Sequence, residues 1–277
     1  MNTTDTCSLC AHPSNKFMQA QILGKYTAEY HHCSHCGFVQ VENPHWLAEA
    51  YEQAINAEDT GIAMRNLEVS RRLAILLHAM FGKRDQDYFV DVAGGYGLLV
   101  RLMRDYGFDF LHSDKWCDNL FASTFDYTPN DHKQPARAVT AIEVLEHLVD
   151  PIEFLDRVFA ETGTDTFIFT TELYTGSQPP ALEDWSYFGV EHGQHIAFYS
   201  ANTLAHLASR YKLQYSQILG LHIFSPQPVK LLRKKLLWGT LTETAAAEWV
   251  RWRRGNLFLQ DSQKLRYRNG KARQPSS

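Results

Sequence analysis

The chain has 277 residues, of which 44% are apolar and 21% charged, a composition typical of a globular protein rather than a disordered or fibrous one. Its longest apolar runs are too short to cross a bilayer, which argues against a membrane-spanning protein. The net charge of −4 is uneven, because residues 230–277 carry 12 Lys and Arg against 3 Asp and Glu and so leave −13 for residues 1–229. This acidic body argues against a protein whose whole face binds nucleic acid, but leaves open a local anion-binding patch on the basic tail.

The N-terminus shows no secretory signal, because it lacks a basic region followed by an apolar one. We therefore expect a cytoplasmic protein. The sequence does not determine its oligomeric state.

Two Cys-x-x-Cys pairs near the N-terminus predict a metal site. They are formed by Cys7 and Cys10 and by Cys33 and Cys36. In a cytoplasmic protein this pattern favours a structural four-thiolate zinc site over disulfides, since four sulfurs leave no open position for a water. A redox-active dithiol is the alternative. The module has few Lys and Arg, so we interpret it as a folding module or substrate platform rather than a nucleic-acid reader.

Residues 46–81 predict two helices with a break near 59–61. Their apolar residues recur at helical spacing. Tyr51 and Arg65 are candidates for closing over a ligand, and the simpler alternative is a helical face packed on a sheet.

The stretch 88–100 predicts a buried strand, a glycine turn and a helix. Asp91 lies in the strand, and Gly94, Gly95 and Gly97 form the turn. Glycines let the backbone bend sharply and approach a ligand, while N–H groups at the helix start face the same space. The spacing is one residue tighter than the dinucleotide fingerprint, and by itself it is a weak signal.

Two later stretches strengthen the interpretation. Residues 108–113 predict a strand that ends at Asp114, whose carboxylate suits the two hydroxyls of a ribose. Residues 138–151 predict an apolar strand, an acidic turn and a helix begun by proline. Together with the glycine turn, these stretches resemble the class I S-adenosylmethionine (SAM) dependent methyltransferases over roughly residues 85–225. The alternative is an unrelated α/β fold with fortuitous glycines.

The resemblance implies an α/β fold with a Rossmann-like, mostly parallel sheet whose last strand is antiparallel. It also implies SAM as the cofactor. Trp116 would pack on the adenine, with core packing as the alternative, and a weak third strand near 123–127 would bring Asp126 to the adenine amino group. The cofactor-binding residues that it implies are Asp91, Gly94, Gly95, Gly97, Asp114, Trp116, Asp126 and Glu143.

The acidic turn has two interpretations. In the one we favour, it closes the cofactor pocket. In the other, Glu143, Glu146 and His147 hold a second divalent ion such as Mg²⁺, because Glu-x-x-Glu-His is similar to the pattern of ubiquinone-pathway O-methyltransferases and small-RNA 2′-O-methyltransferases. Those families also use a further histidine.

The loop 173–187 follows the next strand, where members of this fold shape the acceptor pocket. It leads into residues 185–200, which interleave aromatic residues with histidines and resemble the active-site stretch of sugar C-methyltransferases. We predict His195 as a general base, supported by His192 and Glu191, because the pKa of histidine lies near working pH. A histidine satisfied in the core is the alternative.

The segments predict a zinc ribbon (1–45), a helical cap (46–84), a SAM-binding domain (85–228) and a basic helical extension (229–277). Within the extension we expect an amphipathic helix over 229–238 and disorder from 269 onward. The predicted function is SAM-dependent methyl transfer to a small molecule or sugar, at O, C or N. Some sugar C-methyltransferases similar to this chain also begin with a zinc module. The alternatives are an inactive SAM-fold scaffold, and an RNA methyltransferase that uses the basic tail.

Overall fold

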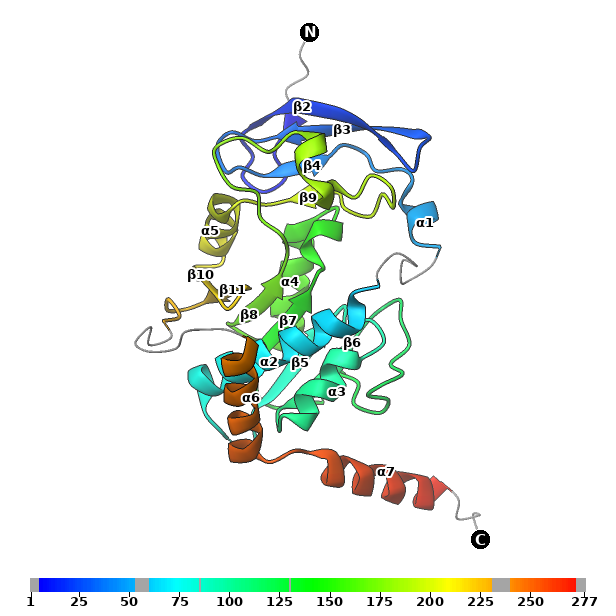
Figure 1. The fold of residues 1–277 in the computed structure, drawn as a ribbon, viewed down its shortest axis with the longest axis vertical. Coiled ribbons are helices and arrows are strands. Elements are labelled where there is room, and N and C mark those ends of the chain that lie inside the picture. Colours follow the sequence, from blue (N-terminus) through cyan, green and yellow to red (C-terminus); the bar gives the residue numbers. More distant parts are fainter. Residues whose placement is uncertain (1–4, 53–59, 85, 130, 231–239, 273–277) are drawn as a thin grey trace. The chain divides into compact units, whose positions relative to one another are not determined.

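The structure is a computed structural model that describes residues 5–52, 60–84, 86–129, 131–230 and 240–272 (Figure 1). Among these residues no helix has the length and apolar character needed to cross a membrane. The chain divides into two compact units, one formed by residues 1–59 and 141–228 and the other by residues 60–140 and 229–277.

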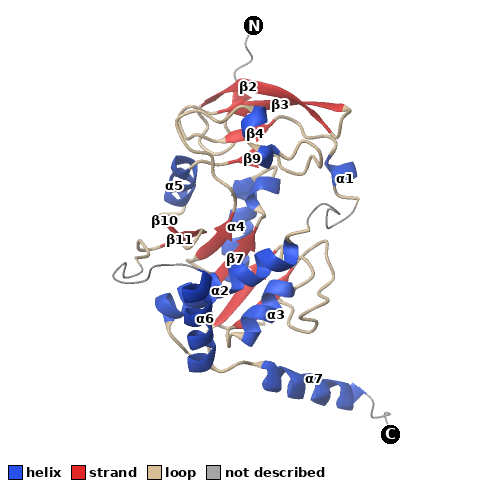
Figure 2. Ribbon diagram, viewed as in Figure 1, coloured by secondary structure: helices blue, strands red, loops and turns tan. Residues whose placement is uncertain are grey.

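The first unit contains a five-stranded antiparallel sheet in the order β1-β2-β3-β4-β9 (Figure 2). Four strands come from the predicted zinc module, and the fifth comes from residues far along the chain. The shared core lies between this sheet and the loops around β9, and includes Tyr30, Phe188 and Phe198. The strands are β1 (Asp5–Thr6), β2 (Pro13–Ile22), β3 (Tyr26–His32), β4 (Val39–Val41) and β9 (Ala197–Phe198).

The second sheet has six strands in the order β10-β11-β8-β7-β5-β6. In it β5 pairs in parallel with β6 and β7, and β11 pairs antiparallel with β8 and β10. Every residue of β5 is buried, as expected for a central parallel strand. This order confirms the Rossmann-like sheet with an antiparallel last strand. The strands are β5 (Tyr88–Val92), β6 (Asp109–Ser113), β7 (Ala138–Ile142), β8 (Phe167–Thr170), β10 (Gln214–Ile218) and β11 (Leu221–Ser225).

The predicted third strand near 123–127 is reduced to one parallel bridge between His112 and Asp126 in the described part of the chain. The helix starts follow their sequence signals. Asp150 accepts two backbone N–H groups ahead of α4, which begins with proline, and Ser200 forms a capping box at α5. The helices are α1 (Leu47–Ala50), α2 (Ile62–Phe81), α3 (Leu98–Asp105), α4 (Pro151–Thr162), α5 (Ala201–Arg210), α6 (Thr240–Arg254) and α7 (Phe258–Ala272), with short 3₁₀ turns η1 (Leu145–His147), η2 (Leu182–Asp184) and η3 (Ser186–Phe188).

The C-terminal prediction needs one correction. Disorder was expected from residue 269, but α7 continues to Ala272, so this prediction is wrong for residues 269–272. Asp261 in the first turn of α7 is bonded to the buried guanidinium of Arg104, and a helix anchored at its start adds further residues at low cost. Residues 273–277 and most of the predicted helix 229–238 lie outside the described residues. In the same unit α6 packs along α2 (Figure 1).

Candidate functional site

The glycine turn follows β5 and leads into α3. Gly97 has φ +80°, and a Cβ at this position would lie 2.3 Å from Asn119 Oδ1, so a larger residue does not fit. Gly95 has φ +55°, and a Cβ there would meet no atom within 4 Å. The backbone of the turn is therefore bare and faces open space at Gly95, as a ligand cradle requires.

Asp114 lies at the same turn although it follows β6. Its Oδ2 accepts the N–H of Gly95 at 2.9 Å, and its Oδ1 accepts the N–H groups of Trp116 and Cys117 at 2.7 and 2.8 Å. An ionised carboxylate has about four acceptor positions, so one on Oδ2 remains for a ligand. Trp116 is 83% exposed and therefore does not pack in the core.

Asp91 lies buried at the end of β5. Its Oδ1 accepts the hydroxyl of Thr140 at 2.5 Å. Burial raises the pKa of Asp91 to about 7, a rise that Thr140 and His112 oppose and Asp114 increases. The carboxyl therefore changes charge near neutral pH inside the cradle.

His112 connects the turn to Asp126 and was not among the predicted site residues. Its Nε2–H donates to the carbonyl of Gly95 at 2.8 Å, and its Nδ1 lies 3.5 Å from Asp126 Oδ1. Asp126 also accepts the side-chain N–H of Asn119 at 2.8 Å. A histidine two residues before the predicted ribose acid, at a buried strand position, was the signal that could have identified it.

A second cluster lies in the other unit, on η1 and the segment before β9. Glu146 is 0% exposed, and among the described residues neither of its carboxylate oxygens has a hydrogen-bond partner. Burial raises the pKa of Glu146 to about 8 and the charge of Glu143 adds to the rise, while the hydroxyls of Tyr187 and Thr171, outside hydrogen-bond geometry, oppose it. A buried carboxyl without a donor is costly unless a proton or a cation accompanies it.

His147 and His195 bring ring nitrogens to Glu146, and one ligand atom from each of the three residues lies within 4.8 Å of the others. Nδ1 of His147 lies 3.1 Å from the carbonyl of Gln194, and Nδ1 of His195 lies 2.6 Å from the carbonyl of Tyr187. A carbonyl only accepts, so Nδ1 of His195 carries the proton and its Nε2 keeps its lone pair. Nδ1 of His147 faces the Tyr51 hydroxyl as well as a carbonyl, and a hydroxyl can donate or accept.

The pKa of His195 is lowered to about 3, first by burial and then by His147. His195 is therefore neutral at working pH. The hydroxyl of Tyr51, on the residue after α1, lies 2.9 Å from Nδ1 of His147.

The other predicted residues of this region lie around the cluster. Glu143 has φ +54° and its N–H donates to Thr170 Oγ1 at 3.0 Å, but it is not one of the three converging ligands. The ring centre of His192 lies 4.8 Å from that of His195, whereas Glu191 is exposed.

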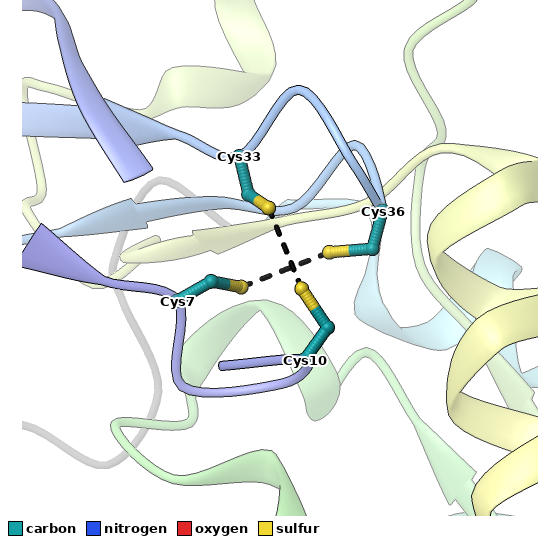
Figure 3. Close-up of side chains that lie close together, drawn as sticks. All are labelled: Cys7, Cys10, Cys33 and Cys36. Atoms are coloured by element: carbon teal, nitrogen blue, oxygen red, sulfur yellow. Dashed lines mark hydrogen bonds between the residues drawn. The ribbon is translucent and has the colours of Figure 1, made fainter. Parts of the chain in front are cut away.

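The four predicted zinc ligands meet in the first unit (Figure 3). Cys7 and Cys10 come from the loop after β1, and Cys33 and Cys36 come from the loop between β3 and β4. The Sγ atoms of Cys7 and Cys36 lie 3.7 Å apart and those of Cys10 and Cys33 lie 3.5 Å apart. Tetrahedral zinc with Zn–S bonds of about 2.3 Å requires S···S separations of about 3.8 Å, so this donor set fits the ion.

A family model described as a methyltransferase domain matches residues 65–218, more than half of the chain. The chain belongs to this methyltransferase family. The match covers β5, β6, β7 and β8 and the turns that follow them, so the cradle and the cluster are both within it. No curated protein sequence matches the chain.

Several solved structures are similar to the methyltransferase at low identity. The 1,6-didemethyltoxoflavin N1-methyltransferase of Burkholderia thailandensis is 16% identical, with 75% of this chain and 96% of that chain covered and a TM-score of 0.45. A family 2 O-methyltransferase of Planctomyces limnophilus, solved with apigenin, is 15% identical over 66% and 62% of the chains, with a TM-score of 0.44. A methyltransferase of calicheamicin biosynthesis is 12% identical, with a TM-score of 0.40, and the chain spans 61% of its length.

The residues of the methyltransferase fit SAM by their own chemistry. The bare turn at Gly95 would admit the cofactor close to the backbone, and Asp114 keeps one acceptor position beside it. The exposed ring of Trp116 lies two residues after Asp114 in the loop. The structure brings Gly95, Gly97, Asp114 and Asp126 together through His112 and Asn119.

Proposed function

We propose that this methyltransferase moves the methyl group of SAM to a small polar acceptor, of sugar or similar type, and that the acceptor loses its proton at the cluster of Glu146, His147 and His195. The observation that supports the proposal most is the convergence of a buried carboxyl and two imidazoles, of which His195 keeps its Nε2 lone pair because its Nδ1–H donates to a backbone carbonyl. Hydroxyls and acidic C–H groups of a sugar are acceptors that such a cluster can deprotonate. The methylated atom stays undetermined between O, C and N.

Each residue of the cradle has a proposed role toward SAM. Asp114 accepts a ribose hydroxyl at the remaining acceptor position of its Oδ2, Trp116 covers the adenine and Asp126 accepts the adenine amino group. Gly95 and Gly97 leave the backbone without a side chain beside the methionine part of SAM. Gly94, Asp91 and Glu143 are further proposed cofactor-binding positions. When bound, SAM would supply a methyl group carried on a sulfonium sulfur, and the acceptor would displace that sulfur from the methyl carbon in line, with S-adenosylhomocysteine as the leaving group. The protein therefore has mainly to align the acceptor and exclude water.

His195 is our candidate for the residue that takes the acceptor's proton on Nε2. Its ring orientation is set by the Tyr187 carbonyl, which holds the proton on Nδ1. A positioned base contributes about 10²–10⁴-fold to the rate, and the low pKa of His195 puts its contribution toward the lower end of that range. His192 lies against His195, and Glu191 stays a proposed supporting residue.

A second candidate role for the same cluster is to hold a divalent cation. The observation that favours it is Glu146, a buried carboxyl with no hydrogen-bond partner among the described residues, next to His147 and to His195, whose Nδ1–H donates to a carbonyl. Metal-binding histidines commonly have this backing. Two imidazoles and one carboxylate suit zinc, iron or manganese better than Mg²⁺. Such an ion would supply a Lewis acid for the acceptor oxygen.

We also propose a structural zinc ion held by Cys7, Cys10, Cys33 and Cys36, whose sulfur separations suit it. The segment boundaries at residues 45, 84 and 228 and the cytoplasmic location stay predictions from the sequence.

The test combines cofactor binding with transfer. S-adenosylhomocysteine (SAH) is titrated calorimetrically into the wild-type protein, Asp114→Ala, His195→Ala and two controls, Asp118→Ala and His206→Ala. Methyl transfer from labelled SAM to a panel of sugars and sugar nucleotides is followed on the same samples. We expect Asp114→Ala to lose SAH binding and His195→Ala to keep it while losing transfer at least about 100-fold. Both controls should behave as wild type.

Other outcomes identify the alternatives. Transfer that does not depend on His195 contradicts its role as a base. The divalent cation is supported if chelation abolishes methyl transfer, if zinc or manganese restores it, and if transfer is absent in Glu146→Gln. SAH binding without transfer to any acceptor supports a scaffold. RNA binding that falls steeply with salt and requires residues 230–273 supports RNA methylation.

A further inference from the structure

The chain around His195 is attached to the N-terminal zinc module through its backbone. We call residues 5–46 the ribbon and residues 189–198 the His195 segment. Strand β9, at the end of the segment, pairs with β4 of the ribbon, and the N–H of Val41 donates to the carbonyl of Ile196 at 2.8 Å. His195 directly precedes Ile196, so the last strand of the ribbon fixes the backbone at the residue next to it.

The other end of the segment is held by one side-chain and one backbone hydrogen bond from the ribbon. The indole N–H of Trp46 donates to the carbonyl of Gly193 at 2.8 Å, and the N–H of Leu23 donates to the carbonyl of Val190 at 2.9 Å. Gly193 has φ +66°, and a Cβ there would lie 2.6 Å from Ile22 Cγ2 and 3.0 Å from the indole nitrogen. The turn before His195 is thus shaped directly against the ribbon.

We propose that the ribbon is a positioning element for the acceptor site, and that Trp46 positions His195 through the carbonyl of Gly193. This inference rests on the proposed function of His195. The hydrogen bonds at Gly193 and Ile196 bracket His195 on both sides, so its Nδ1 meets the Tyr187 carbonyl in one orientation. Releasing either bond lets the ring leave that orientation.

Residues at the end of α1, which follows the ribbon, also form hydrogen bonds to this site. The side-chain N–H of Gln194 donates to the carbonyl of Ala50 at 2.7 Å, and the Tyr51 hydroxyl lies 2.9 Å from Nδ1 of His147. The short stretch 46–51 therefore bonds to Gly193 and Gln194, which precede His195, and to His147 itself.

The cysteine site would control the strand that carries these bonds. Cys33 follows β3 and Cys36 precedes β4, and the N–H of Cys33 donates to the carbonyl of Phe38 at 2.9 Å. The carbonyl of Cys36 also accepts the side-chain N–H of Asn202 at 3.1 Å. Zinc held by the four thiolates would tie β3 to β4, and through β4 to β9.

The test uses the full-length chain with SAH bound and measures amide hydrogen exchange residue by residue. Trp46→Phe keeps an aromatic ring but removes the donor to Gly193. The matched control is Tyr26→Phe, which removes a donor to Glu49 at 2.7 Å from a ring stacked on Trp46 but makes no bond to the segment. We expect exchange at the amides of Gly193 and Ile196 to rise about fivefold in Trp46→Phe, as for the loss of one hydrogen bond, and to stay unchanged in the control.

A second readout is the ¹⁵N shift pattern of the His195 ring, which reports the Nδ1–H tautomer. We expect a mixture of tautomers in Trp46→Phe and one tautomer in Tyr26→Phe. Unchanged exchange and an unchanged ring in Trp46→Phe would overturn the proposal.

Zinc removal by a chelator is the third arm. The expected result is faster exchange in β4 and in the His195 segment together, with β5 amides and SAH affinity unchanged. A segment that stays protected while β4 exchanges would contradict the coupling. Neither exchange nor ring shift requires turnover, so a failure of the proposed base role, seen as normal transfer in His195→Ala, is distinguished from a failure of positioning.

Discussion

Asp91→Asn should make the methyltransferase more stable at high pH while leaving its stability at low pH nearly unchanged. Asp91 is fully buried at the end of β5, where its carboxylate has the Thr140 hydroxyl as hydrogen-bond donor. Burial raises its pKa from 3.8 to about 7, with His112 lowering and Asp114 raising it to a smaller extent. A carboxamide at the same position can accept the Thr140 hydroxyl and carries no charge to bury.

The sign follows from proton binding. Between about pH 4 and pH 7 folded Asp91 holds a proton that the unfolded chain has released, so this group's contribution to stability falls as pH rises through that window. A shift from 3.8 to about 7 corresponds to about 4 kcal/mol once both states are ionised. Because part of the window lies below pH 5, the advantage of Asn over Asp should grow by about 3 kcal/mol between pH 5 and pH 8.

The assay is urea unfolding of the ligand-free protein at pH 5 and pH 8, comparing wild type, Asp91→Asn and Asp118→Asn. Asp118 is an exposed carboxyl of the neighbouring loop, and its replacement should give the same difference at both pH values. A stability difference for Asp91→Asn that is equal at pH 5 and pH 8 would refute the reasoning, because it would mean that burial does not control the ionisation of Asp91.

Three further outcomes are expected. Gly97→Ala places a Cβ against Asn119 and adds about 1 kcal/mol of backbone strain, which the free turn relieves by relaxing and SAH binding has to restore. SAH affinity measured by calorimetry should therefore fall about fivefold; retained affinity would contradict the cradle geometry. Asp261→Ala leaves the 1% exposed Arg104 without its main partner and should lower the free energy of unfolding in urea by about 3 kcal/mol, whereas a neutral result would mean that Arg104 repairs its contacts elsewhere. Cys33→Ser should reduce bound zinc, measured by elemental analysis, from one ion per chain to none.

Much of the local structure could be predicted because its signals are short-range. The strand at 88–92, the glycine turn and the proline-started helix at 151 follow from apolar runs, from backbone conformations that suit glycine, and from the missing N–H of proline. Helix ends were less predictable. The expected disorder was wrong for residues 269–272, because α7 is anchored through the contact of Asp261 with Arg104, which lies 157 residues away in sequence.

The sequence by itself determined the methyltransferase family, the glycine turn after β5 and the four-cysteine pattern, because each depends on residues spaced within one strand, turn or loop. Only the tertiary structure decided which residues meet across the chain. The pairing of β4 with β9, the link from Gly95 through His112 to Asp126, and the convergence of His195 on Glu146 and His147 depend on long-range registers that no local pattern specifies. For the same reason the tautomer of His195 follows from the backbone carbonyl of Tyr187, whose position is set by the folded loop.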